Sequence, residues 1–321
     1  MTGIMSRGLK EGMKTSWTLG KVIFPITLIV TILQYTPVLP WVMEKLSPLM
    51  RLIGLSGEAA VPLVLGNALN LYAGIAAIVS FDFSVKEVFI MAVMLSFSHN
   101  LFIESAVASR VGVSWWLIVG IRVTLALIAA IVINLVWNGG TEMAQYGLIS
   151  SNVAADPSGW GAIILQGFQT AIIAIVQLAC IVIPLMVIMQ FLREKGWLSI
   201  LSNKFAPFTR LLGMEKNTSM TMVAGLTIGL AYGAGLMIQA VEEDNVSKKD
   251  MLLALIFLVS CHAVVEDTLI FIPLGIPVWP LLLIRLTTAI LLTLAIAYIW
   301  KRVDYSKNRK EATNEHRYNT L

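Results

Sequence analysis

The sequence KLSPLMRLIG at residues 45–54 recurs as KFAPFTRLLG at residues 204–213. Both copies carry a lysine, a proline, an arginine and a glycine at the same spacing, and each follows an apolar run that contains its own proline, Pro25 or Pro184. Each residue of the first copy lies 159 positions before its counterpart. Matches of Pro, Gly and charged residues in register arise by chance far less often than matches of Leu or Ile, so the chain is predicted to contain two copies of one structural unit.

The repeat extends outward from these stretches in both halves. Gly66 aligns with Gly225 at the same offset, and after an insertion of four residues near 242–245 the offset becomes 163. The pairs aligned at this second offset are His99/His262, Glu104/Asp267, Gly112/Gly275, Trp116/Trp279, Arg122/Arg285 and Trp137/Trp300. The repeated unit therefore covers nearly the whole chain.

The composition places this repeat in a membrane. Of the 321 residues 57% are hydrophobic and 13% charged, and the mean hydropathy is +0.81, which is more apolar surface than a soluble globule buries. The longest apolar runs approach the roughly 20 residues needed to cross a bilayer; they are Val22–Leu33, Leu117–Val136, Ala171–Met189 and Leu281–Tyr298. We expect an all-α polytopic protein with the lipid bilayer as its partner, and no nucleic-acid binding.

The charges at the two ends indicate the orientation. Residues 1–21 carry four basic groups and one acid, residues 301–321 carry six basic groups and three acids, and residues 138–160 contain no Lys or Arg. Basic flanks stay on the cytoplasmic side of a membrane. We therefore expect both termini in the cytoplasm and the linker outside, in a multi-pass protein of the cytoplasmic (inner) membrane.

Five regions follow from this pattern. They are a cytoplasmic tail at 1–15, a first repeat at 16–137, an extracytoplasmic linker at 138–159, a second repeat at 160–300 and a basic cytoplasmic tail at 301–321. With both tails inside and the linker outside, each repeat crosses an odd number of times, so the two repeats have inverted orientations. Each has four apolar segments, so one segment per repeat should be broken or re-entrant, as in transporters built from inverted repeats.

Charged residues inside the apolar segments are expensive to bury and mark candidate functional positions. Glu104 lies eight residues before Gly112 and Arg122 ten residues after it, so in a helical hairpin both lie about 12–15 Å from the turn. The same spacing relates Asp267 and Arg285. The sequence thus predicts one structural ion pair in each repeat.

Two histidines in register form the main candidate site. Five residues rotate about 140° around a helix, so His99 and His262 point away from Glu104 and Asp267 unless the helix breaks there. Glu266 follows His262 by four residues and would share its face; Ile103 stands at its position in the first repeat. We predict that His99, His262 and Glu266 ligate a divalent metal, relay a proton or bind a polar solute at the repeat interface, the alternative being helix-packing hydrogen bonds.

Gly-rich segments at about 58–80 and 217–241 supply a second candidate surface. The glycines alone favour close helix packing. Asn67, Asn70 and Tyr72 are polar groups that need partners in lipid, and an unwound helix lining a polar path provides them. These three residues are therefore candidate ligands for substrate, together with Asn100.

The chain resembles the Gate-domain, or nucleoside-recognition, family of integral membrane proteins. The resemblance rests on the two repeats, the Gly-rich polar segments and the stretches His99-Asn100 to Glu104-Ser105 and Cys261-His262 to Glu266-Asp267. The domain also occurs in concentrative nucleoside transporters and in the ferrous iron transporter B family, where a Cys and a Pro stand at the positions of His99 and Phe102. The resemblance implies a transporter-like fold, and the chain is also similar to a fusion of the paired spore-maturation Gate proteins.

These observations predict a secondary transporter that moves a small polar solute or ion by alternating access at the repeat interface. A nucleoside-like solute and a divalent metal ion both remain open as cargo, and the protein is expected to be no enzyme. Apart from a divalent metal ion, the sequence indicates no cofactor, and a homo-oligomer remains open. A membrane-embedded metalloenzyme and a non-transporting assembly or regulatory protein are the alternatives.

Overall fold

The computed structural model describes residues 2–147, 159–230, 233–235, 237–238 and 245–318. These residues form helices and loops, and their β-structure is limited to one isolated bridge between Ser84 and Met143. Most of the predicted linker, at 148–158, and part of the second Gly-rich segment lie outside the described residues. The all-α prediction is confirmed for the described part of the chain.

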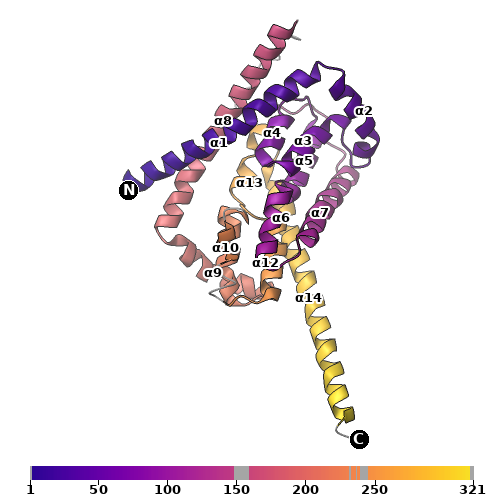
Figure 1. Cartoon of the computed structure of the whole chain (residues 1–321), viewed down its shortest axis with the longest axis vertical. Coiled ribbons are helices and arrows are strands. Elements are labelled where there is room, and N and C mark those ends of the chain that lie inside the picture. Colours follow the sequence, from indigo (N-terminus) through magenta and orange to yellow (C-terminus); the bar gives the residue numbers. More distant parts are fainter. Residues whose placement is uncertain (1, 148–158, 231–232, 236, 239–244, 319–321) are drawn as a thin grey trace.

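The two halves present similar successions of elements (Figure 1). The first half consists of α1 (Thr2–Gln34), α2 (Val38–Arg51), η1 (Gly57–Ala59), α3 (Ala60–Ala68), α4 (Leu71–Ile78), α5 (Val85–Ser98), α6 (Leu101–Arg110) and α7 (Trp115–Val136). The second half consists of α8 (Trp160–Glu194), α9 (Trp197–Leu211), η2 (Lys216–Thr218), α10 (Ser219–Ile228), α12 (Lys248–Ser260), α13 (Glu266–Leu269), η3 (Ile272–Leu274) and α14 (Val278–Tyr318). The second half thus has α13 and η3 where the first has α6. Helices α1 and α14 run through the predicted boundaries at residues 15 and 300, so both tails continue a helix.

Five helices in the described residues are long and apolar enough to cross a membrane. They are Gly3–Gln34, Val85–Arg110, Trp115–Val136, Trp160–Ile188 and Val278–Val303. The span Val85–Arg110, which comprises α5 and α6, is 83% buried, whereas the other four are 17–35% buried. The other four spans thus expose most of their apolar side chains, as lipid requires, while the central span Val85–Arg110 is enclosed by protein.

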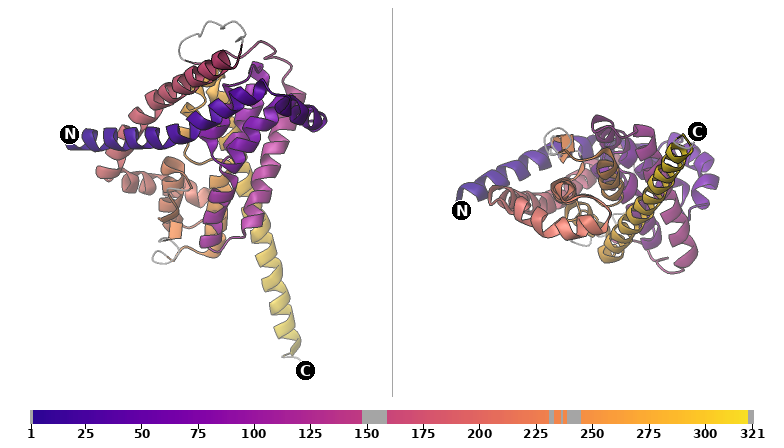
Figure 2. Two further views of the ribbon diagram at one scale, coloured as in Figure 1. Left: turned by 45° about the horizontal axis from the view of Figure 1, so that its top comes forward. Right: turned by 90° about the horizontal axis from the view of Figure 1, so that it is seen from below.

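Helices α1 and α8 pack along each other at one side of the molecule (Figures 1 and 2). A Cβ atom on Gly8 would lie 2.7 Å from Cα of Val187, and one on Gly12 would lie 2.9 Å from Cα of Ile183, so only glycine permits this approach. Beside this contact Arg7 pairs with Glu194 through two hydrogen bonds of 2.7 and 2.5 Å. The hydrogen bonds from Arg7 lower the pKa of Glu194 to about 2.

Helices α5, α7, α12 and α14 form the centre, and α5 contacts α14 while α7 contacts α12, so the two halves interlock there. Helix α14 then extends beyond the body of the molecule (Figure 2). Gly112 lies in the turn between α6 and α7, and Gly275 lies in the turn between η3 and α14. Their φ angles of +83° and +70° favour glycine. Both were predicted as turn positions.

Several apolar segments are broken. In the first half the chain breaks between α3 and α4 and again between α5 and α6, where Asn100 has a left-handed φ of +50°. In the second half it breaks between α12 and α13, where Ala263 has a φ of +41°. One broken segment was predicted in each half, and the described residues show two breaks in the first half and a further break in the second half at Gly229, where α10 ends with a φ of +89°.

Candidate functional site

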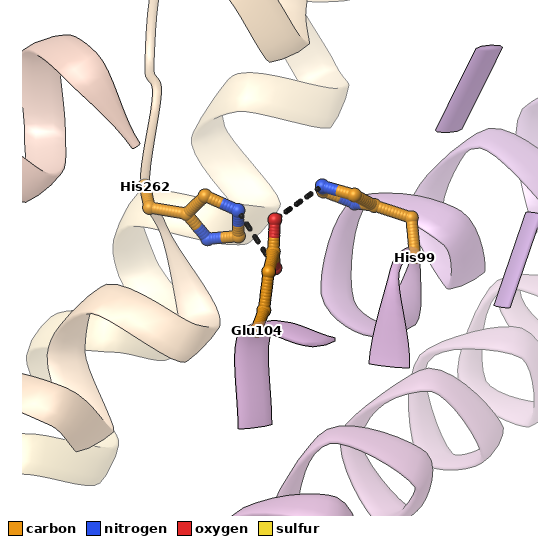
Figure 3. A group of neighbouring side chains, drawn as sticks. All are labelled: His99, Glu104 and His262. Carbon is orange, nitrogen blue, oxygen red and sulfur yellow. Dashed lines mark ion pairs between the residues drawn. The ribbon is translucent and has the colours of Figure 1, made fainter. Parts of the chain in front are cut away.

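Two equivalent helix ends bring the histidines together (Figure 3). His99 terminates α5 and His262 follows the end of α12, and their ring centroids lie 5.2 Å apart. Nδ1 of His99 lies 2.7 Å from the carbonyl oxygen of Leu95, and Nδ1 of His262 lies 2.8 Å from that of Leu258. The duplicated sequence therefore builds the same local arrangement twice.

These contacts fix the chemistry of both rings. A carbonyl oxygen only accepts hydrogen bonds, so each Nδ1 must carry the proton and donate it. In the neutral form of each imidazole, Nε2 then presents a lone pair. The two Nε2 atoms point to the same place, and that of His262 has no hydrogen-bond partner of good geometry.

Glu104 occupies the space between the rings. Its Oε1 lies 3.5 Å from Nε2 of His99, and its Oε2 lies 3.3 Å from Nε2 of His262. The three ligand atoms lie within 4.8 Å of one another, and His99, Glu104 and His262 are 5%, 6% and 1% exposed. Two imidazole lone pairs and a carboxylate repel one another unless a proton or a cation binds among them, and this donor set suits a divalent transition metal.

The third member of this cluster differs from the residue predicted. In a continuous helix from 262 to 266, Glu266 would lie beside His262, and this geometry was the basis for predicting it as a third ligand. Instead α12 ends at Ser260 and α13 begins at Glu266, so the chain turns between them. Glu104, which was assigned to a structural pair alone, lies there because α6 starts anew after Asn100 and turns its first residues toward the histidines.

Both predicted ion pairs are present. Nη2 of Arg122 lies 2.8 Å from Oε2 of Glu104, and Nη2 of Arg285 lies 2.9 Å from Oδ2 of Asp267. Both arginines are fully buried. A second contact of Asp267 is with Nε2 of His262, at 3.6 Å.

The arginines also complete the broken helices. A helix end leaves carbonyl groups without donors. Arg122 donates from Nε to the carbonyl oxygen of Phe97 at 2.8 Å and from Nη2 to that of His99 at 2.5 Å. Arg285 donates from Nη2 to the carbonyl oxygen of His262 at 2.7 Å. Each guanidinium therefore holds both the acid and the helix end that carries the histidine.

Glu266 has a different partner. It accepts a hydrogen bond from the hydroxyl of Tyr72, which comes from α4 in the first half. This contact joins the two halves beside a cavity of about 30 Å³ that Tyr72 lines together with Gln177 and Pro273. Tyr72 thus belongs to the central region, but it meets Glu266 rather than the histidines.

The three candidate asparagines have structural roles at the helix breaks. Asn67 donates to the carbonyl oxygen of Leu63 at 2.6 Å, and Asn70 caps α4 by accepting from the backbone N–H of Ala73 at 3.0 Å. Asn100 supplies the left-handed residue between α5 and α6. The structure does not bring the side chains of Asn67 or Asn70 to the histidines, and their observed contacts explain the helix breaks.

Glycines hold the broken segments close in both halves. The N–H of Asn100 donates to the carbonyl oxygen of Gly66 at 2.9 Å, and that of Ala263 donates to the carbonyl oxygen of Gly225 at 3.0 Å. A Cβ atom on either glycine would approach a leucine side chain, Leu95 or Leu258, to 2.5 Å. The repeat-related glycines thus position the breaks that present the histidines.

Comparison with known proteins is consistent with this duplicated plan. The family model described as Gate, nucleoside recognition, matches residues 16–122 and again residues 175–276, two segments that begin 159 residues apart. The chain is also 64% identical over 312 residues to a protein of Bacillus subtilis (strain 168) named uncharacterized membrane protein YvoD, covering 97% of this chain and all of that protein. No solved structure gave a significant match.

Proposed function

Since this chain belongs to the Gate (nucleoside recognition) family of membrane proteins, we propose that it is a secondary transporter of the cytoplasmic membrane whose cargo is a divalent metal ion. The cargo binds between His99, Glu104 and His262, with Nε2 of each imidazole and the carboxylate as ligands. No nucleoside-sized cargo is needed to explain this arrangement.

The convergence of these three ligand atoms within 4.8 Å carries the proposal. Backbone carbonyl groups hold both imidazole rings, so the Nε2 lone pairs of His99 and His262 are oriented toward the same space before a metal ion binds. Second hydrogen bonds of this kind are what orient metal-ligating histidines in proteins. A set of two imidazoles and one carboxylate favours Mn²⁺, Fe²⁺, Co²⁺ or Zn²⁺ over Ca²⁺ and Mg²⁺, which prefer oxygen ligands alone.

The duplicated fold supports transport by alternating access. Each half contributes one histidine on a broken helix and one acid paired with an arginine from the next helix. If the halves are inverted, with both termini cytoplasmic and the linker outside, equivalent rocking of the halves opens the centre to either side in turn. The paired arginines keep this centre near neutrality between cargo cycles.

The burial of the three ligands favours transport over hydrolysis. A catalytic metal needs a coordination position that is open to water and substrate. At 1–6% exposure these side chains are enclosed in the state described. A non-transporting assembly protein has no need for such a preformed ligand set, so it is the weaker alternative.

Flux measurements test the proposal. Purified full-length protein in proteoliposomes should carry at least one of Mn²⁺, Fe²⁺, Co²⁺ and Zn²⁺ down its gradient, and Glu104→Gln should abolish that flux. Asp82→Asn, which changes an exposed acid, serves as the matched control. Flux of nucleosides without flux of metal ions would show that the cargo is a nucleoside. Flux of neither class would refute transport.

A further inference from the structure

We propose that Glu266 is the site of a proton that the protein exchanges for its cargo cation. This inference rests on the transport function proposed above. It assigns the coupling ion to a residue outside the histidine cluster, at the contact between α4 and α13.

Three acids lie in the central region, and their partners differ. Glu104 and Asp267 each contact a buried arginine. Among the residues that the structure describes, no Lys or Arg pairs with Glu266, whose hydrogen-bond partner is the neutral hydroxyl of Tyr72. Glu266 is half-buried, and an ionised carboxylate that is partly removed from water without a cationic partner is costly, whereas a protonated one is not.

The surrounding charges favour the neutral acid. Asp267, its neighbour on α13, and Glu104 from the first half both disfavour a further negative charge on Glu266, whereas the hydroxyl of Tyr72 on α4 and the imidazole of His99 act in the opposite direction. The arginines are already engaged with the other two carboxylates. A second negative charge beside Asp267 is therefore uncompensated until a cation arrives.

The contacts of Glu266 indicate which oxygen carries the proton and how water could reach it. Oε1 of Glu266 accepts from Tyr72, so the proton resides on the other carboxyl oxygen. The neighbouring cavity of about 30 Å³, lined by Tyr72 from the first half and Ile270 from the second, exceeds the roughly 10–15 Å³ that a cavity needs in order to hold one water molecule. Opening of the contact between the halves would expose this carboxyl group to water.

Cargo binding and proton release are then linked by charge. A divalent cation at the histidine cluster stabilises the ionised form of Glu266, so the acid gives its proton to water as the cation binds. When the cation leaves, the carboxylate takes a proton from the opposite side. At this site one proton therefore crosses in the direction opposite to each cation. The O–H bond of the Glu266 carboxyl group is the one covalent bond that breaks and re-forms.

The site is present once in each chain. Ile103 stands at the repeat-related position and is 60% exposed. The pseudo-symmetry of the centre is thus broken at the residue proposed to carry the proton. This predicts a contribution of one proton from Glu266 to each cycle.

Proton release during metal binding tests the exchange. Full-length protein in weakly buffered detergent solution is titrated to saturation with the metal ion that supports flux, and released protons are counted per bound ion. Glu266→Gln should release one proton fewer than the wild type, while Asp82→Asn should match it. Equal release from Glu266→Gln and wild type would overturn the proposal.

Infrared spectroscopy provides a test that needs no metal. The C=O stretch of a protonated carboxyl group should be present in wild-type protein at neutral pH, absent in Glu266→Gln and retained in Asp82→Asn. If the wild type transports no metal but shows this band, the transport proposal fails while the proton site stands. If the band is missing from the wild type, the proton site is refuted whatever the flux.

Discussion

Nη2 of Arg122 lies 2.5 Å from the carbonyl oxygen of His99, and the repeat-related pair, Arg285 and His262, makes the same contact at 2.7 Å. The same nitrogen of each arginine also holds an acid, Glu104 or Asp267. The guanidinium thereby ties a helix end, a candidate ligand and a carboxylate into one unit. Two such units face each other across the boundary between the halves.

Removal of Arg122 should destabilise the protein strongly. Arg122→Leu leaves the buried carboxylate of Glu104 and two carbonyl groups without a donor, and breaking a buried pair from one side costs about 3–5 kcal/mol. Thermal unfolding in detergent measures the change. Arg110→Leu, at an exposed arginine on the same hairpin, should change stability little, and equal losses in the two variants would contradict this account.

The glycine contacts predict a compensated pair of substitutions. Gly225→Ala places a methyl group 2.5 Å from the buried side chain of Leu258, and overpacking of this kind costs about 1–3 kcal/mol. Leu258→Ala should restore part of that loss by making room. Gly120→Ala, where no neighbouring atom lies within 4 Å, is the control for both. Additive losses in the double variant would show that the two residues do not meet.

The two histidines should contribute alike to metal binding. His99→Ala and His262→Ala each remove one metal ligand. Mutation of a residue that only hydrogen-bonds to a ligand lowers metal affinity by about 10–100-fold, so each of these variants should lose at least that much affinity. Affinity should also weaken on acidification, because imidazole binds metal only when neutral. Calorimetric titration at several pH values measures both effects, and a large loss in one variant alone would indicate an asymmetric site.

The proposed orientation makes a labelling prediction. In a background without Cys180 and Cys261, Glu142→Cys in the linker should react with an impermeant maleimide added outside intact cells. Lys301→Cys, beyond the last apolar run, should react only after the membrane is permeabilised. The reverse pattern would show the opposite topology, and external labelling of both positions would rule out an odd number of membrane crossings between them.

Much of the fold was predictable because rare residues repeat in register. The offsets of 159 and 163 identified two units, and the spacing about Gly112 and Gly275 predicted both ion pairs. These predictions depend on local geometry alone, namely the rise of a helix and a tight turn.

The composition of the histidine cluster was less predictable because it depends on tertiary contacts. The left-handed conformation of Asn100 is accompanied by its bond to Gly66, and it turns Glu104 toward His99. A continuous helix, the natural expectation from an apolar run, places Glu104 elsewhere and groups Glu266 with His262. The asparagine directly after His99 was the one local signal for a break.

The central claim is that His99, Glu104 and His262 together bind a divalent cation. Equilibrium dialysis of purified full-length protein against Mn²⁺, Fe²⁺, Co²⁺ and Zn²⁺ tests it most directly. We expect one tightly bound ion per chain for at least one of these metals, and this binding should be retained in Asp82→Asn and lost in Glu104→Gln. Equal binding by Glu104→Gln and the wild type, or no binding by the wild type, would contradict it.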